Sequence, residues 1–337
     1  MRIAFVAPLL APLCDATSRG SHVIVADLAR AMKARGHDVM VFCAQGSYLK
    51  GVDTAPIIVD ARSSAFEELQ WHMERWDPDV VSQHACDAEA FAMSHGRPVV
   101  HTLHANPLDE SAASGAARSR APLVAVSRDS HRRWREAGCI DVSTIPNGIP
   151  EFPATVCDPE PIALVAGRIA PEKGTATAIR AAHRAGLEPV VVGEIYDRGY
   201  FAREIVPLLD GTHVYRTLPR ARVLALMARA AVTLTPVEWD EPFGLVAAEA
   251  QTAGCPVVGY ARGALPDVVP QDEGGLLVPA GDEDALVSAI GAAREMGRVA
   301  VREQARDRFD FDVMVDAYEE LLAEAATGMA HARKAAA

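Results

Sequence analysis

The fold is decided at residues 237–250, which read Val-Glu-Trp-Asp-Glu-Pro-Phe-Gly-Leu-Val-Ala-Ala-Glu-Ala. An apolar run at 231–235 precedes them and predicts a buried parallel strand. A helix-forming run follows from 245 to 253 and is closed by Gly254. Open α/β sheets bind ligands where a strand gives way to a helix at its carboxyl end. We therefore expect a ligand site in this loop.

The residue types in this stretch indicate which ligand. Glu241 lies in the loop, and the next helix begins with Phe243, Gly244 and Leu245, whose backbone N–H groups can attract an anion. Gly244 permits a close approach because it has no Cβ. Glu249 lies about one helical turn further on, where its carboxylate could accept hydrogen bonds from a ribose diol. This set suits a sugar nucleotide; the stretch alone equally fits an acidic loop before an ordinary helix.

The composition sets limits on the class of protein. The 337 residues are half hydrophobic, enough for two globular domains with separate cores. A net charge of −12 argues against nucleic-acid or anionic-membrane partners bound by bulk electrostatics. The six cysteines form no C-x-x-C pair, and no leader or membrane-spanning run is evident. We expect a cytoplasmic protein without a strong membrane signal.

Strand and helix patterns alternate along the chain, which predicts parallel, doubly wound sheets. Residues 1–150 form the first series, and a proline-rich linker from 145 to 161 separates it from a second series in 151–310. Apolar residues at helical spacing between 311 and 322 predict a final helix over 311–325, followed by a frayed tail. The helices expected include 65–76 in the first series and 202–209 in the second, and the small residues 18–21 are expected to open the first helix. The loops 8–20, 45–55 and 106–119 of the first series would select the acceptor. The expected fold class is α/β, with two Rossmann-like domains facing a central cleft.

A second loop is suited to a diphosphate. Gly167 and Arg168 open the segment 167–174, and Lys173 follows five residues after Arg168. Arginine can bind two phosphate oxygens, and lysine adds a point charge. The alternative is a surface loop in which Lys173 pairs with Glu172. The dinucleotide and P-loop glycine motifs are absent, which weakens the dehydrogenase and P-loop interpretations.

Polar residues follow several strands of the first series. His84, His101, His104 and Ser127 all stand at predicted strand ends, so as a set they indicate a pocket at the carboxyl edge. The spacing of His101 and His104 is a weak metal signal, because no acidic ligand cluster accompanies it. We predict no metal site.

These motifs, taken together, resemble those of the retaining glycosyltransferases of family four, which have the GT-B fold. Glu241 and Glu249 match that family's two glutamates separated by seven residues, and segment 167–174 matches its diphosphate loop. Segment 145–148 resembles its pre-linker segment, segment 254–258 the strand after its signature helix, and segment 102–104 its N-domain motif near the acceptor and donor sugar. The resemblance covers nearly the whole chain.

The resemblance implies roles for individual residues. It gives Arg168 and Lys173 the diphosphate, Glu249 the ribose and Glu241 the transferred sugar, with the amides of Phe243, Gly244 and Leu245 assisting. The catalytic set it implies is Glu241, Arg168, Lys173 and His104. It also implies that the last helix crosses back onto the N-terminal domain. The family often has two glycines where this chain has Arg19-Gly20, which weakens the expected contact of Gly20 with phosphate.

We therefore expect a retaining, metal-independent hexosyltransferase. It would move a sugar from a UDP- or GDP-sugar to a hydroxyl of a small soluble acceptor, without a cofactor. Three alternatives stay open: a membrane-surface glycosyltransferase with a lipid-linked acceptor, a sugar-nucleotide epimerase or hydrolase, and a non-catalytic sugar-nucleotide binder.

Overall fold

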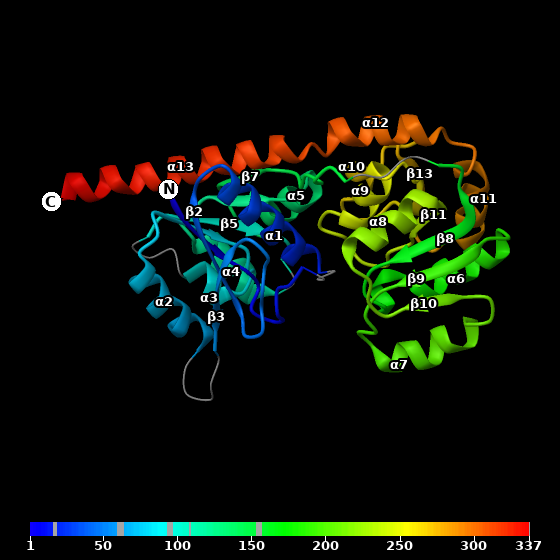
Figure 1. Cartoon of the computed structure of the whole chain (residues 1–337), viewed down its shortest axis with the longest axis horizontal. Coiled ribbons are helices and arrows are strands. Elements are labelled where there is room, and N and C mark those ends of the chain that lie inside the picture. The colour runs from blue at the N-terminus through cyan, green and yellow to red at the C-terminus, as the bar shows by residue number, and fades with distance from the viewer. Residues whose placement is uncertain (16–18, 59–63, 93–96, 108, 153–156, 337) are drawn as a thin grey trace. The chain divides into compact units, whose positions relative to one another are not determined.

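The computed structural model describes residues 1–15, 19–58, 64–92, 97–107, 109–152 and 157–336. The chain divides into two compact units (Figure 1). The N-terminal unit comprises Met1–Gly148 and Asp312–Ala337, and the C-terminal unit comprises Ile149–Phe311. The domain boundaries expected at 150 and 310 fall within two residues of these divisions.

The described residues of the N-terminal unit form a seven-stranded parallel sheet in the order β3-β2-β1-β4-β5-β6-β7. Short apolar runs supply these strands, as expected for strands buried on both faces. Their bounds are β1 Arg2–Val6, β2 Asp38–Ala44, β3 Asp53–Ile57, β4 Val80–Gln83, β5 Val99–Leu103, β6 Leu123–Ala125 and β7 Val142–Thr144.

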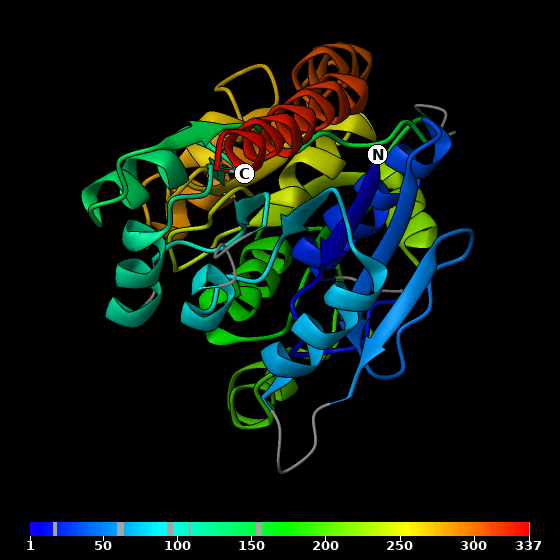
Figure 2. The same ribbon diagram turned by 90° about the vertical axis from the view of Figure 1, so that its left-hand side faces the viewer.

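Helices cover both faces of this sheet. The connecting helices are α1 Gly20–Ala34, α2 Ala65–Trp76, α3 Ala88–Ala92, α4 Glu110–Arg118 and α5 Arg128–Glu136. On β5, Val99 packs in a core cluster with residues of α2, and Leu103 packs in another with residues of α3, α4 and α5. Thr102 of the same strand instead contacts the last helix, α13 Phe311–Ala336. Side chains alternate across a strand, so α13 and α2 lie on opposite faces, as Figure 2 also shows.

The described part of the C-terminal unit repeats this plan with six parallel strands in the order β10-β9-β8-β11-β12-β13. The strands are β8 Glu160–Ala166, β9 Glu188–Val192, β10 His213–Tyr215, β11 Ala230–Thr235, β12 Val257–Tyr260 and β13 Gly275–Val278. The helices are η1 Pro171–Lys173, α6 Thr175–Arg184, α7 Arg198–Tyr200, α8 Arg220–Arg229, α9 Leu245–Thr252, α10 Leu265–Val268, α11 Glu283–Ala293 and α12 Arg298–Arg308.

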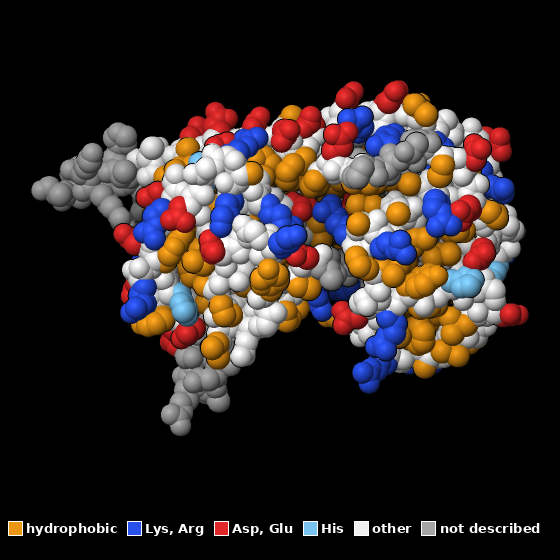
Figure 3. Space-filling model, in the orientation of Figure 1, with side chains coloured by type: hydrophobic (Ala, Val, Ile, Leu, Met, Phe, Trp, Pro, Cys, Tyr) orange, Lys and Arg blue, Asp and Glu red, His pale blue; other side chains and the backbone are white. Residues whose placement is uncertain are grey.

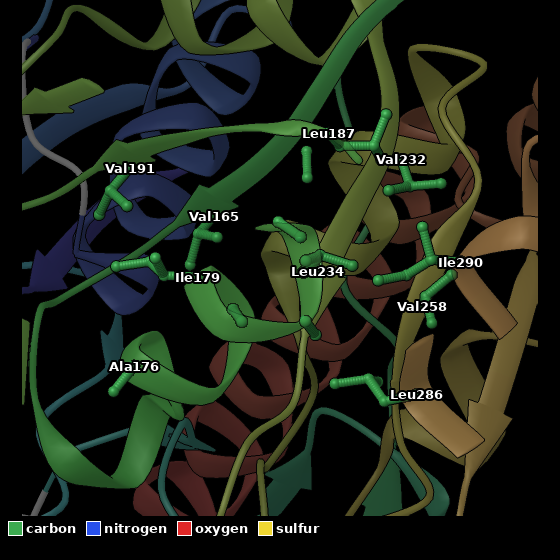
Figure 4. Packing of buried hydrophobic residues seen from close by; sticks show 14 of the residues in the cluster. Val165, Ala176, Ile179, Leu187, Val191, Val232, Leu234, Val258, Leu286 and Ile290 are labelled. Carbon is green, nitrogen blue, oxygen red and sulfur yellow. The ribbon is translucent and has the colours of Figure 1, made fainter. Parts of the chain in front are cut away.

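The core of the C-terminal unit lies between its sheet and two long helices. Ile179 of α6 and Leu286 and Ile290 of α11 pack against Val232 and Leu234 of β11 (Figure 4). All five side chains are at most 1% exposed. On the other face, α8 and α9 pack against β11. This packing fixes the carboxyl ends of β8 and β11, from which both candidate donor loops emerge.

The last helix ties the end of the chain to the N-terminal unit. The Tyr318 hydroxyl pairs with the Thr102 hydroxyl at 3.2 Å, and Glu319 accepts hydrogen bonds from Arg35 and His37. The sequence placed a frayed tail after residue 325, whereas α13 continues to Ala336. The segment after residue 325 is rich in alanine, which has the highest helix propensity and favours continuation of the helix despite Gly328.

Two further segments differ from the sequence expectations. Residues 202–209, expected as one α-helix, lie instead in a π-helical turn η2 Phe201–Ile205, which continues from the short α7, and a 3₁₀ turn η3 Val206–Leu208. Pro207 has no amide to donate to the carbonyl four residues earlier. The loop expected at 106–119 contains α4, whose N-cap Asp109 accepts from the amide of Ala112 at 2.7 Å. Ser18, expected to open α1, lies outside the described residues.

Candidate active site

Glu241 joins the two predicted donor loops. Its Oε2 accepts a hydrogen bond from Lys173 Nζ at 2.6 Å and another from Trp239 Nε1 at 2.9 Å. The Lys173 ammonium also lies 4.9 Å from the centre of the Trp239 ring, a cation–π distance. The Lys173 and Glu241 side chains are only 20% and 15% exposed, so solvent screens their attraction weakly.

Backbone contacts hold these loops in place. The Glu238 amide donates to the Glu172 carbonyl at 2.9 Å, and the Ala264 amide donates to the Glu241 carbonyl at 2.8 Å. Gly263 has φ +57°, and a Cβ there would lie 2.3 Å from the Glu241 nitrogen. Only glycine therefore fits against the Glu241 backbone.

Arg168 follows β8 and lies beside the same site. Its guanidinium stacks over Tyr196 at 4.9 Å and pairs with Glu172 at 3.3 Å, with a third of its side chain exposed. The expected alternative pairing of Lys173 with Glu172 is not formed: Arg168 contacts Glu172, and Lys173 contacts Glu241. Gly167 has φ +130°, and its missing side chain leaves open space on that side of the loop.

The N-terminus of α9 offers backbone N–H groups. Gly244 is its N-cap with φ +98°, and having no side chain it cannot cap the helix itself. The amides of Ala247 and Ala248 donate the first hydrogen bonds of α9, both to the Gly244 carbonyl. The amides of Leu245 and Val246 precede these bonds, so the helix itself offers them no acceptor. These amides and the helix dipole suit a phosphate or sugar oxygen. Phe243 comes before α9 and is 5% exposed, and its ring centre lies 6.1 Å from that of Phe309, so its side chain is packed in the interior.

Glu249 lies inside α9 and contacts a residue that the motif did not indicate. Its Oε1 accepts a hydrogen bond from Arg220 Nε at 2.7 Å. The two side chains are 11% and 21% exposed. Glu249 is therefore a largely buried carboxylate that an arginine holds, and not a solvated surface glutamate.

His104 of the N-terminal unit lies in a chain of polar side chains at the carboxyl ends of β4 and β5. Its Nε2 lies 2.8 Å from His84 Nδ1, and His84 Nε2 lies 2.9 Å from the Ser82 hydroxyl. Burial, and secondarily His22, lowers the pKa of His104 to about 3. Burial also lowers the pKa of His84 well below its usual value. Both rings are therefore neutral at physiological pH.

Gly20 is the first residue of α1, and the same helix carries His22. His22 Nε2 lies 3.2 Å from the Ala11 carbonyl oxygen, which ties α1 to the loop that follows β1. Burial lowers the pKa of His22 despite this contact. Gly20 and His104 belong to the N-terminal unit, and the other predicted site residues belong to the C-terminal unit.

His101 does not join His104. Its ring lies 5.1 Å from that of Phe91, and it is fully buried. Over the described ranges, no group of three or more His, Cys, Asp or Glu residues could hold a metal ion. The same part of the chain has no helix long and apolar enough to cross a bilayer.

Two site residues were missed by the sequence reasoning. Trp239 stood inside the deciding stretch, two residues before Glu241, and an aromatic residue in a polar loop was the available signal. Arg220 is the first residue of α8, where a positive charge opposes the helix dipole, and that local conflict was its signal.

Comparison with known families tests the resemblance that the sequence motifs indicated. The model described as Glycosyl transferases group 1 matches residues 152–308, and that described as Glycosyltransferase Family 4 matches residues 18–151. The chain belongs to the group 1 glycosyltransferases of family 4. The α/β fold with two GT-B-type domains is thereby confirmed, together with glycosyltransferase function.

Individual relatives of this glycosyltransferase cover nearly its whole length. A D-inositol 3-phosphate glycosyltransferase of Acidothermus cellulolyticus is 26% identical over 97% of this chain and 92% of that protein. A phosphatidyl-myo-inositol mannosyltransferase of Mycobacterium leprae is 29% identical over 87% and 89%. The structure of sucrose-phosphate synthase from Thermosynechococcus elongatus superposes with a TM-score of 0.80 at 20% identity, over 95% of this chain and 98% of that one.

Proposed function

We propose that this glycosyltransferase moves a sugar from a UDP- or GDP-sugar to a hydroxyl acceptor and retains the configuration at the transferred carbon. The observation that carries the proposal is the 2.6 Å contact between Lys173 and Glu241. It brings the predicted diphosphate loop and the predicted sugar carboxylate to one place, beside the N-terminus of α9.

The same residues can stabilise the leaving group. As the glycosidic bond breaks, negative charge grows on the departing diphosphate, while positive charge grows on the sugar ring. Arg168, Lys173 and the α9 amides would bind that negative charge, and one preorganised donor of this kind is worth about 3 kcal/mol of barrier. Because these groups supply the positive charge, the proposed reaction needs no metal, and we expect activity to persist in excess EDTA.

The histidines of the N-terminal unit bear on the proton transfer. A ring whose pKa is about 3, as in His104, is a weak base at neutral pH. This supports a front-face reaction in which the leaving phosphate takes the proton of the acceptor hydroxyl. His104 would then orient a substrate hydroxyl by hydrogen bonding. NMR of the product's anomeric carbon tests retention; an inverted product would contradict the mechanism.

A binding and turnover series tests the donor assignment. UDP, GDP, ADP and dTDP with their common sugar conjugates should be compared by thermal shift, since a ligand at about 100 times its Kd adds about 2.7 kcal/mol of stability. We expect one base to be preferred, and Arg168→Ala to abolish its shift. Arg222→Ala is the matched control, because Arg222 is an exposed arginine of α8. Unchanged turnover of Arg168→Ala at saturating donor would exclude this role for Arg168.

We propose a small soluble acceptor, such as a sugar phosphate or cyclitol, in line with the inositol phosphate named in the first relative. The charge pairing within α5, the helix whose arginines make it a candidate for membrane binding, supports this choice. Its Arg132 and Arg133 both pair with Asp129, and Arg132 also pairs with Glu136 at 3.0 Å, so much of its positive charge is neutralised within the helix. On the face drawn in Figure 3, Lys and Arg are interspersed with Asp and Glu.

The relative named a phosphatidyl-myo-inositol mannosyltransferase favours the second candidate, a lipid-linked acceptor. Partitioning distinguishes the two. After reaction of radiolabelled donor with a mixture of water-soluble cyclitols and phosphatidylinositol vesicles, we expect the labelled product in the aqueous phase. Label extracted into butanol would support the lipid acceptor instead.

A further inference from the structure

The position of Arg220 conflicts with the local rules of helix formation. It is the first residue of α8, where the helix dipole is positive, and the N-cap before it is Pro219, whose side chain provides no cap. The first turn of α8 contains no acidic residue. A cation is thus placed where an anion would stabilise the helix. Residues that break a local rule in this way are expected at functional sites, where another interaction compensates.

The compensating interaction is with Glu249. Arg220 Nε donates to Glu249 Oε1 at 2.7 Å, and the contact joins the start of α8 to the middle of α9. Glu249 is 9% exposed as a residue, and a carboxylate buried to this degree is costly unless an opposite charge faces it. A guanidinium also fixes the direction of its hydrogen bonds, because its N–H groups form a rigid fork.

We propose that Arg220 is a positioning residue that holds the Glu249 carboxylate in place to bind the ribose diol of the nucleotide. This inference rests on the proposed function, in which Glu249 binds the ribose. A carboxylate has about four acceptor positions, so it can accept hydrogen bonds from a guanidinium and from the two hydroxyls of a ribose. Because Arg220 fixes Glu249 before the nucleotide arrives, binding does not have to order that side chain. Arg220 therefore acts on ribose recognition through Glu249.

Discrimination between ribose and 2′-deoxyribose isolates this role. The Kd values of UDP and dUDP, GDP and dGDP, and ADP and dADP should be measured by calorimetry on the full chain. For the base that binds, the wild type should prefer the ribonucleotide about 10- to 100-fold, the range expected for one hydrogen bond to a charged group. In Arg220→Ala we expect that ratio to fall below about threefold. Arg220→Lys, which keeps the charge without the fork, should be intermediate.

The controls separate positioning from a general loss of structure. Arg222→Ala removes the same charge two residues later in α8 and should retain the wild-type ratio. Glu249→Gln should lower the ratio as Arg220→Ala does, and the donor KM should rise in both variants with little change in kcat. If Arg220→Ala weakened the ribonucleotide and the deoxyribonucleotide equally, or if the wild type did not discriminate between them, the positioning role would be overturned. A wild type that binds no nucleotide would overturn the proposed function itself.

Discussion

The protonation of His101 should couple the stability of the N-terminal unit to pH. His101 lies in β5 with no solvent exposure, and among the described residues neither ring nitrogen has a hydrogen-bond partner. Burial lowers the pKa of its ring to about 4. In the unfolded chain the ring returns to its ordinary pKa of about 6.5. Between these two values the unfolded state binds a proton that the folded state does not.

The sign and size of the effect follow from this difference. Because the pKa is lower in the folded state, the stability that a neutral His101 confers is complete above about pH 6.5 and is lost as the pH falls toward 4. Each pH unit in that window is worth about 1.4 kcal/mol, so lowering the pH from 7 to 5 should cost about 2 kcal/mol through His101 alone. His84 and His104 have lowered pKa values as well, and they change stability in the same direction.

Urea unfolding of the wild type and His101→Leu at pH 7 and pH 5 measures this contribution. Tryptophan fluorescence suits the assay, because three of the four tryptophans, Trp71, Trp76 and Trp134, lie in the N-terminal unit. The loss of unfolding free energy between the two pH values should be about 2 kcal/mol smaller in the variant. His183→Leu, at an exposed position, should leave the loss unchanged. Equal pH dependence of wild type and His101→Leu would refute the reasoning.

Substitutions at Lys173, Gly263 and Tyr318 test the site and its support. Lys173→Ala removes the ammonium beside Glu241 and should lower kcat/KM at least 100-fold, which corresponds to about 3 kcal/mol of barrier. A loss of less than tenfold in initial-rate measurements would contradict the assignment. Gly263→Ala introduces a Cβ 2.3 Å from the Glu241 nitrogen and should reduce donor turnover. In the control Gly281→Ala, φ is +84° but no atom lies within 4 Å of the new Cβ, so stability should fall by only about 1–2 kcal/mol and activity should not change. Tyr318→Phe should destabilise the N-terminal unit by about 1 kcal/mol in urea, and Tyr318→Ala by about 3–5 kcal/mol; near-neutral values for both would show that α13 does not stabilise this unit.

Element order was predictable because it depends on short-range patterns. The apolar run at 231–235 and the helix after Gly244 appear as β11 and α9, and α2 has the bounds 65–76 that its periodicity indicated. The pattern at 202–209 is helical in the structure, but a proline within it replaces one α-helix by a π-helical turn and a 3₁₀ turn. In the tail, the apolar stripe ended before the helix did.

The sequence by itself determined the α/β class, the two-unit order, and the residue types of the candidate site, because periodicity, glycine placement and charge spacing are local properties. Tertiary structure alone decided the partners. Lys173 contacts Glu241 across 68 positions rather than the adjacent Glu172, and Arg220 contacts Glu249 across 29. His84 and His104 meet because β4 and β5 are neighbours in a parallel sheet. Such pairs depend on how strands and helices pack in space, and no local pattern encodes which carboxylate or ring a side chain will reach.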